Sequence, residues 1–238
     1  MAERRRNLTN MNMQKLVTVL ITCMGLLSLS HASSKKYKST FSILPTGEVN
    51  QDLYYLNGKE VHKIEFKTRK RSQTYPTKLG KPLQLFIRNA APDAENPFIL
   101  VAQSKSIIRT PRTLFFIKPA KKGSDLPLEL EALNDGLNEF PKGAFRYINL
   151  TKASLVIECG GVEAVLPAYG DTVVKPNIPK NAGSMPIIVK TKKGQRILGG
   201  QTYGIPGDRK MILIKATGKP KAPIALINIP QAVHPNMF

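Results

Sequence analysis

The chain has 238 residues, of which 36 are Lys or Arg and 16 are Asp or Glu, so its formal net charge at pH 7 is +20. It contains two Cys, three His and no Trp. This scarcity of Cys and His argues against a protein metal cage. The length is sufficient for one large sandwich or for two modules of ~100 residues each.

The first 32 residues have the layout of an export signal. A basic start at Arg4–Arg6 and Lys15 is followed by an apolar run over 16–29 and by the small-residue exit Ser30-His31-Ala32. The run of 14 residues is too short to cross a hydrocarbon core of ~30 Å comfortably. We therefore predict a signal peptide over 1–32 and a protein that is exported to the periplasm, the cell surface or the medium.

Two alternatives stay open for this segment. It could be an uncleaved N-terminal anchor, or Cys23 could be the lipidated first residue of a lipoprotein, although Thr22 before it fits that pattern poorly. No later segment approaches ~18 uninterrupted apolar residues, so the sequence predicts no transmembrane span in the mature chain.

The charge balance is the most unusual bulk property. Without residues 1–32 the chain keeps 32 basic and 15 acidic residues, a net charge of +17. Such an excess attracts polyanions. Export argues against nucleic acid, the usual partner of a basic chain, and favours an anionic glycan or envelope polymer. A solvated basic surface without a binding role is the alternative.

The mature chain has the pattern of an all-β protein. Helical periodicity is almost absent after residue 35, and 18 prolines argue against long helices. The run 53–56 leads into Asn57-Gly58, a strong hairpin signal. Further strands are expected over 61–66, 83–87, 98–102, 114–117, 127–133, 144–150, 154–158, 162–166, 172–175, 186–191, 211–215 and 224–229, with turns at Gly160-Gly161, Gly199-Gly200 and 204–207.

A local repeat predicts duplication. Residues 112–118, a Lys/Gly/Pro-rich loop and 127–133 match residues 209–215, a similar loop and 223–229 in the order of Arg, apolar run, Lys and Pro. The spacing between the copies is 97 residues for the first strand and 96 for the second. Self-similarity at one spacing indicates duplicated modules. We predict two tandem β-sandwich domains, 36–134 and 139–232, joined by the turn residues 134–138.

One stretch of the second half resembles a known group of proteins. Residues 140–151 contain Pro-x-Gly-x-Phe-Arg-x-x-Asn-Leu, followed by Gly160-Gly161 and a Leu-Pro-x-x-Gly stretch over 166–170. This pattern resembles uncharacterised exported bacterial proteins with tandem immunoglobulin-like β-sandwich modules. The resemblance implies the fold and transfers no active site.

The sequence offers no recognisable catalytic apparatus. His62 and His234 are the only histidines after residue 32, no Gly-x-Ser-x-Gly occurs, and Cys159 has no neighbouring His. We predict no enzyme activity, no cofactor and no metal. One alternative stays open, a hydrolase whose carboxylates meet in space, with candidates Glu129, Glu131, Glu139, Glu158, Glu163 and Asp171.

Three basic clusters beside expected hairpin tips are the candidate sites for a polyanion. They are Lys67, Arg69, Lys70 and Arg71; Lys118, Lys121 and Lys122; and Lys190, Lys192 and Lys193. Tyr54, Tyr55, Tyr75, Tyr169 and Tyr203 could stack on sugars or lie in the core. The prediction is an exported, non-enzymatic binding or structural module. The alternative is an accessory subunit of a surface assembly that contacts protein through a sheet edge.

Overall fold

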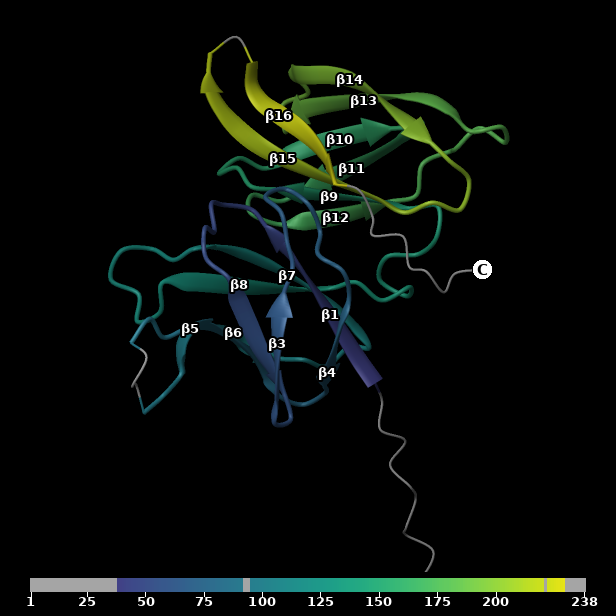
Figure 1. Cartoon of the computed structure of the whole chain (residues 1–238). Coiled ribbons are helices and arrows are strands. Elements are labelled where there is room, and N and C mark those ends of the chain that lie inside the picture. The colour runs from purple at the N-terminus through teal and green to yellow at the C-terminus, as the bar shows by residue number, and fades with distance from the viewer. Residues whose placement is uncertain (1–37, 92–94, 221, 230–238) are drawn as a thin grey trace, which may run out of the picture. The chain divides into compact units, whose positions relative to one another are not determined.

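The computed structural model describes residues 38–91, 95–220 and 222–229 (Figure 1). The predicted signal peptide, Cys23, His234 and the outermost residues of the two predicted domains lie outside this range. All regular structure in the described residues is β-strand, so the all-β prediction is confirmed. Within the same residues there is no helix with the length and hydropathy needed to cross a membrane.

The first eight strands form one sheet in the order β3-β2-β5-β6-β8-β7-β1-β4. The β6–β8 link is a single parallel pair, Ser104 with Leu130, so the sheet bends there into two four-stranded faces. The strands are β1 (Lys38–Pro45), β2 (Leu53–Asn57), β3 (Glu60–Ile64), β4 (Tyr75–Lys78), β5 (Pro82–Arg88), β6 (Phe98–Ile107), β7 (Arg112–Pro119) and β8 (Leu128–Asn134).

The second eight strands form two sheets of four, in the orders β11-β10-β13-β14 and β12-β9-β15-β16. They are coloured green to yellow in Figure 1. The strands are β9 (Phe145–Asn149), β10 (Leu155–Cys159), β11 (Val162–Leu166), β12 (Asp171–Val174), β13 (Gly183–Thr191), β14 (Arg196–Gly204), β15 (Lys210–Lys219) and β16 (Ala222–Ile229).

The two sets of strands repeat one pattern of pairing. In each set the first strand pairs antiparallel with the fourth and parallel with the seventh, as β1 does with β4 and β7 and β9 does with β12 and β15. The second strand pairs with the third and fifth, and the seventh with the eighth. The described residues nevertheless belong to one compact unit, so the predicted boundary between two domains stays a prediction.

Three strands were missed by the sequence analysis, namely β1, β4 and β14. The pair Gly199-Gly200, expected to be a turn, lies inside β14, where Gly199 pairs with Ile188 and Gly200 with Ile187. Glycine gives a strand no side chain to pack, so the apolar pattern that marks a strand is lost there. The pair Gly160-Gly161 is a turn as expected, with φ of 54° and 75°.

The hairpin after β2 forms one residue later than its sequence suggests. Asn57 ends β2 and pairs with Glu60, so the two loop residues are Gly58 and Lys59. Gly58 has a φ of 73°, a conformation that glycine adopts at little cost.

Each set of strands encloses its own apolar core. The first core contains Phe41, Tyr55, Leu85, Phe115 and Ile117, all almost fully buried, and its rings meet edge to face. The second core is built mainly from aliphatic side chains around Phe145 and Tyr147, among them Ile157, Val189, Ile212 and Ile214. Each inner face therefore has the interdigitating core expected of a β-sandwich.

A third core joins the outer faces of the two sets. Leu114 and Phe116 of β7 pack there with Ile148 of β9 and with Met211 and Leu213 of β15. These strands are buried on both faces, since alternate residues of each point into a different core. The continuous runs Leu-Phe-Phe-Ile and Met-Ile-Leu-Ile follow from this arrangement, because a strand covered on both sides needs no polar face.

The third core predicts that the two sets unfold together. We expect Leu213→Ala to lower the free energy of unfolding by about 2–5 kcal/mol, because it empties space between both sets. Urea denaturation followed by tyrosine fluorescence and far-UV circular dichroism should show one transition. The control is Leu56→Ala at a side chain that is 49% exposed, which should cost less than about 0.5 kcal/mol. Two separate transitions in the unmodified chain would contradict the shared core.

Candidate functional site

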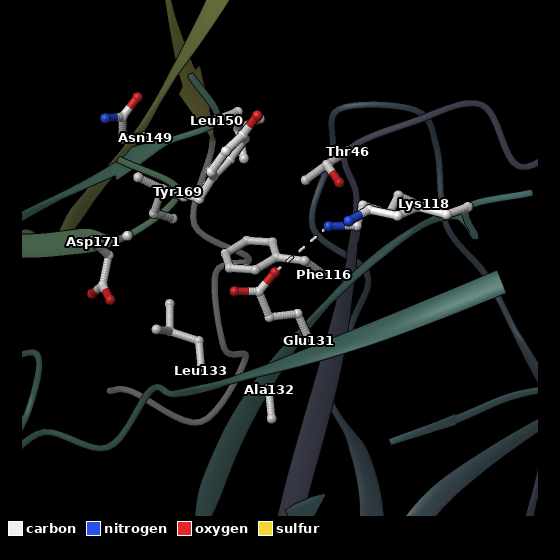
Figure 2. Close-up of a pocket in the computed structure, with 13 residues that line it drawn as sticks. Thr46, Phe116, Lys118, Glu131, Ala132, Leu133, Asn149, Leu150, Tyr169 and Asp171 are labelled. Carbon is white, nitrogen blue, oxygen red and sulfur yellow. Dashed lines mark ion pairs between the residues drawn. The ribbon is translucent and has the colours of Figure 1, made fainter. Parts of the chain in front are cut away.

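A cavity of about 310 Å³ opens beside the third core, a volume at the lower end of the range for ligand sites (Figure 2). Its lining includes Lys118 near the end of β7, Lys121 in the β7–β8 turn and Tyr169 in the loop before β12. The remaining lining residues come from both sets of strands, and they are Thr46, Phe116, Glu131, Ala132, Leu133, Ile148, Asn149, Leu150, Gly170 and Asp171.

Asn149 fixes the loops on one side of this cavity. Its side chain is fully buried, and its Nδ2 donates to the carbonyls of Ala153 (2.7 Å) and Pro167 (2.8 Å). Its Oδ1 accepts from the backbone N (2.9 Å) and the hydroxyl (2.7 Å) of Thr151. Because both the nitrogen and the oxygen of this buried amide have hydrogen-bond partners, its burial leaves no polar atom unpaired, and the bonds hold the partner residues in place. The loops after β9 and after β11 are therefore tied together.

Tyr169 is the exposed aromatic residue that this arrangement presents. Its backbone N donates to the carbonyl of Thr151 (3.1 Å), and its φ is 52°, in the left-handed region that a bulky residue rarely adopts. This conformation costs about 1–2 kcal/mol relative to right-handed backbone. The residue is 61% exposed, so burial does not repay that cost. Strain of this kind concentrates at functional sites.

The charged residues that line the cavity are two lysines, Lys118 and Lys121, and two carboxylates, Glu131 and Asp171. Lys118 Nζ lies 3.8 Å from Glu131 and 3.7 Å from Glu129, and Asp171 lies 3.1 Å from Arg146 Nε. Lys121 is exposed, and no ion pair is recorded for it among the described residues. The pairs of Lys118 are long and partly exposed, so they are weak and can be exchanged for an anionic ligand.

The other predicted basic residues lie in different settings. Lys122 is exposed on the same turn as Lys121, and Lys192 and Lys193 are exposed at the β13–β14 turn. Lys190 is bound by Glu158 (2.6 Å) and Glu163 (3.0 Å), and these carboxylates raise the pKa of its ammonium group. The exposed Lys67, Arg69 and Lys70 form a turn between β3 and β4.

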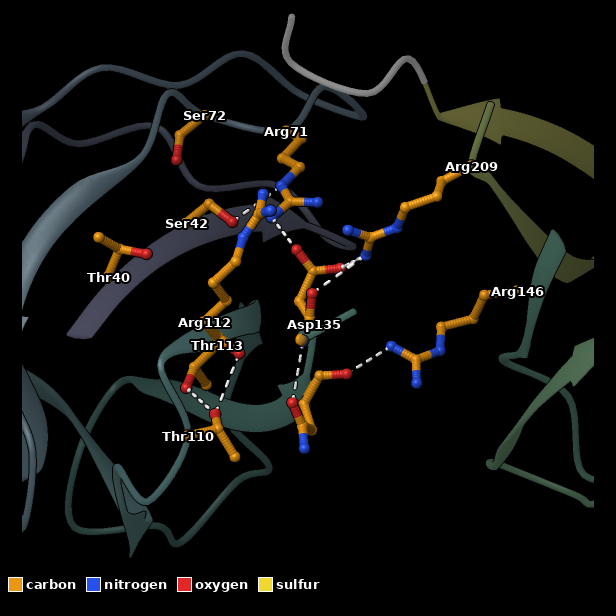
Figure 3. Close-up of polar contacts among 12 residues, drawn as sticks. Thr40, Ser42, Arg71, Ser72, Thr110, Arg112, Thr113, Asp135, Arg146 and Arg209 are labelled. Atoms are coloured by element: carbon orange, nitrogen blue, oxygen red, sulfur yellow. Dashed lines mark hydrogen bonds and ion pairs between the residues drawn. The ribbon is translucent and has the colours of Figure 1, made fainter. Parts of the chain in front are cut away.

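Arg71 has a buried structural partner (Figure 3). Its Nη2 lies 2.5 Å from one carboxylate oxygen of Asp135, and Arg209 Nη2 lies 2.5 Å from the other. Asp135 is completely buried, and the two arginine side chains are 5% and 8% exposed. Burial lowers the pKa of Arg209, and the charge of Asp135 opposes that effect. We call Arg71, Asp135 and Arg209 the arginine clasp; it joins both sets of strands to the segment between them.

The clasp predicts that replacing its one carboxylate by an uncharged amide strongly lowers the stability of the fold. Asp135→Asn should lower the free energy of unfolding by about 3–5 kcal/mol, because two buried guanidinium groups lose their shared counter-charge. Urea denaturation would measure the difference. The matched control, Asp208→Asn, removes the same charge from an exposed turn and should change stability by less than about 0.5 kcal/mol. Equal effects of the two substitutions would show that the clasp contributes little.

The described residues hold no group of three His, Cys, Asp or Glu side chains close enough to share a metal ion. His62 lies 3.3 Å from Glu60 and stacks on Tyr55. Cys159 is buried, and burial raises the pKa of its thiol. A protonated, inaccessible thiol is a poor nucleophile.

The raised pKa of Cys159 predicts how stability depends on pH. The folded chain keeps the thiol proton at pH values where the unfolded chain loses it, so this contribution is complete below pH ~8.5 and declines above it. Urea denaturation between pH 7 and 10 should show parallel pH dependence of the two chains below pH ~8.5. Above it, the free energy of unfolding should fall more steeply for the unmodified chain than for Cys159→Ala, by up to about 1.4 kcal/mol per pH unit. Identical slopes would contradict the assignment.

Comparison with known proteins adds no family. No family model matches the chain, and no curated protein matches it.

Proposed function

We propose that the protein is an exported, non-enzymatic binding or structural module that attaches to an anionic cell-envelope or extracellular polymer through basic loops. The observation that carries this proposal is the cavity that Lys118, Lys121 and the exposed Tyr169 line together. Lysine ammonium groups attract anions, and an exposed aromatic ring offers a flat apolar face to a sugar.

The finer description of the chain is part of this proposal. A signal peptide over 1–32 would be followed by two immunoglobulin-like sandwiches, 36–134 and 139–232, and the repeated strand pairing supports the duplication. Likeness to exported bacterial proteins with such modules rests on the motif around Phe145 and Asn149. The strand orders differ from the ABED and CFG sheets of antibody constant domains, so the likeness is one of architecture.

Two functions of other classes have an observation in their favour. In the second set of strands, β14 (9 residues) is an edge strand of one sheet and β16 (8 residues) is an edge strand of the other. An edge strand can accept a further strand from a protein partner. Co-purification from envelope extracts would support an accessory subunit. Glu131 and Asp171 line one cavity, as a carboxylate-dependent hydrolase requires. Each already faces a cation of the chain, Lys118 and Arg146, which makes this candidate weaker.

The test of the main proposal is retention on a polyanion. The chain from Ser33 should bind a heparin-like or envelope-glycan matrix at low salt and elute as salt rises, because screening weakens exposed charge pairs. Lys118→Ala with Lys121→Ala should elute at clearly lower salt.

The control double variant is Lys142→Ala with Lys175→Ala, which removes the same charge from exposed positions outside the cavity. It should elute with the unmodified chain. Passage of the unmodified chain through the matrix without delay would refute polyanion binding, and equal losses in both variants would refute the cavity as its location.

A further inference from the structure

A second cavity adjoins the first and shares Leu150 and Tyr169 with it. Its volume is about 750 Å³, and it is more open than the first. Its charged lining residues are Lys152 and Arg196, both exposed, and no carboxylate lines it. The rest is mainly apolar and includes Leu155, Ile197, Ala216, Pro220, Pro223 and Ile224.

The position of this cavity follows from a difference between the two sets of strands. In the first set the β6–β8 pair joins the two faces through Ser104 and Leu130. The corresponding strands of the second set, β14 and β16, belong to separate sheets. Arg196 and Ile197 of β14 and Ile224 of β16 line the opening. The cavity therefore lies between β14 and β16, at the position where β6 and β8 pair in the first set.

The guanidinium group of Arg196 occupies the space that a side chain at Gly199 would need. A Cβ atom at Gly199 would overlap with the guanidinium of Arg196, so the arginine lies across the strand where Gly199 leaves room. Any larger residue at 199 would move it. Gly199 therefore leaves space for the Arg196 side chain.

Resting on the proposed function, we propose that the two cavities form one groove for an acidic polysaccharide chain, whose sugar ring stacks on Tyr169 between two cationic subsites. Lys118 and Lys121 bind acidic groups on one side of the ring, and Lys152 and Arg196 bind them on the other. The apolar side chains of the second cavity contact the uncharged faces of the sugars.

Sugar fits this groove better than an acidic peptide. The aromatic contact is a single exposed ring at the junction, which matches one flat sugar face, and the cations stand on both sides of it. Because Tyr169 is strained and exposed, its ring contributes little to folding and is available for a ligand.

The experiment is calorimetric titration of the chain from Ser33 with uronic-acid oligomers of increasing length, neutral oligomers of the same lengths and polyglutamate. Affinity should rise with the length of the acidic oligomers and then level off. Lys152→Ala with Arg196→Ala should weaken long oligomers about tenfold or more and leave the shortest ones unchanged, whereas Lys118→Ala with Lys121→Ala should weaken both. Sulfated oligomers in place of uronic acids identify which anionic group is preferred.

Tyr169→Gly tests the stacking contact without a cost in folding. Glycine relieves the left-handed strain but adds freedom to the unfolded chain, so stability should change little, while affinity for acidic oligomers should fall about three- to tenfold. The control is Ala182→Gly, which changes another left-handed residue (φ 37°) and should leave affinity intact.

Each remaining outcome is decisive. Binding that does not depend on length, or on Lys152 and Arg196, would overturn the groove and leave the polyanion module standing. Polyglutamate binding as tight as that of the oligomers would overturn the sugar assignment. Absence of binding to every acidic polymer would overturn the proposed function itself.

Discussion

The apolar layer between sheets β8-β7-β1-β4 and β12-β9-β15-β16 is the constraint on which the rest of the molecule depends. A sandwich normally leaves the outer face of each sheet to water, as alternation of polar and apolar residues allows. Here β7 and β15 carry apolar side chains on both faces, so the two sets of strands must cover each other. The cavity beside Tyr169 lies at the rim of that contact and exists only because both sets contribute to it.

Much of this fold could be predicted from short-range patterns. Most strands, the Gly160-Gly161 turn and the repeat spacing are local properties, and the structure has them. The third core could not be predicted. A run such as Leu-Phe-Phe-Ile indicates that a strand is buried on both faces, but it does not show whether a loop or another sheet covers it. Arg71 was grouped with surface charges because its partner Asp135 lies 64 residues away. The cavity was missed too: Lys118 and Lys121 were candidates, but Asn149 and Tyr169 meet them only through tertiary packing.

The two sets of strands show how one pairing pattern supports different surfaces. In the first set the sheet is continuous through Ser104, whose hydroxyl accepts from the backbone N of Leu83 and donates to the carbonyl of Ser106. In the second set the corresponding strands, β14 and β16, belong to separate sheets. The unpaired edge between β14 and β16 and the left-handed backbone of Tyr169 both lower the stability of the fold locally. Departures that stability does not explain are where binding surfaces are expected.

The arginine clasp joins residues that lie far apart in the sequence. Its members are separated by 64 and 74 residues, so no partial chain ending before Arg209 contains all three. Such a chain can bring Arg71 to Asp135 but lacks Arg209, and the outer faces of β1 and β7 stay uncovered. The last strands to emerge during synthesis therefore follow the second arginine of the clasp and complete the apolar layer. A truncated product would expose an aggregation-prone sheet face, the kind of surface that chaperones and proteases recognise.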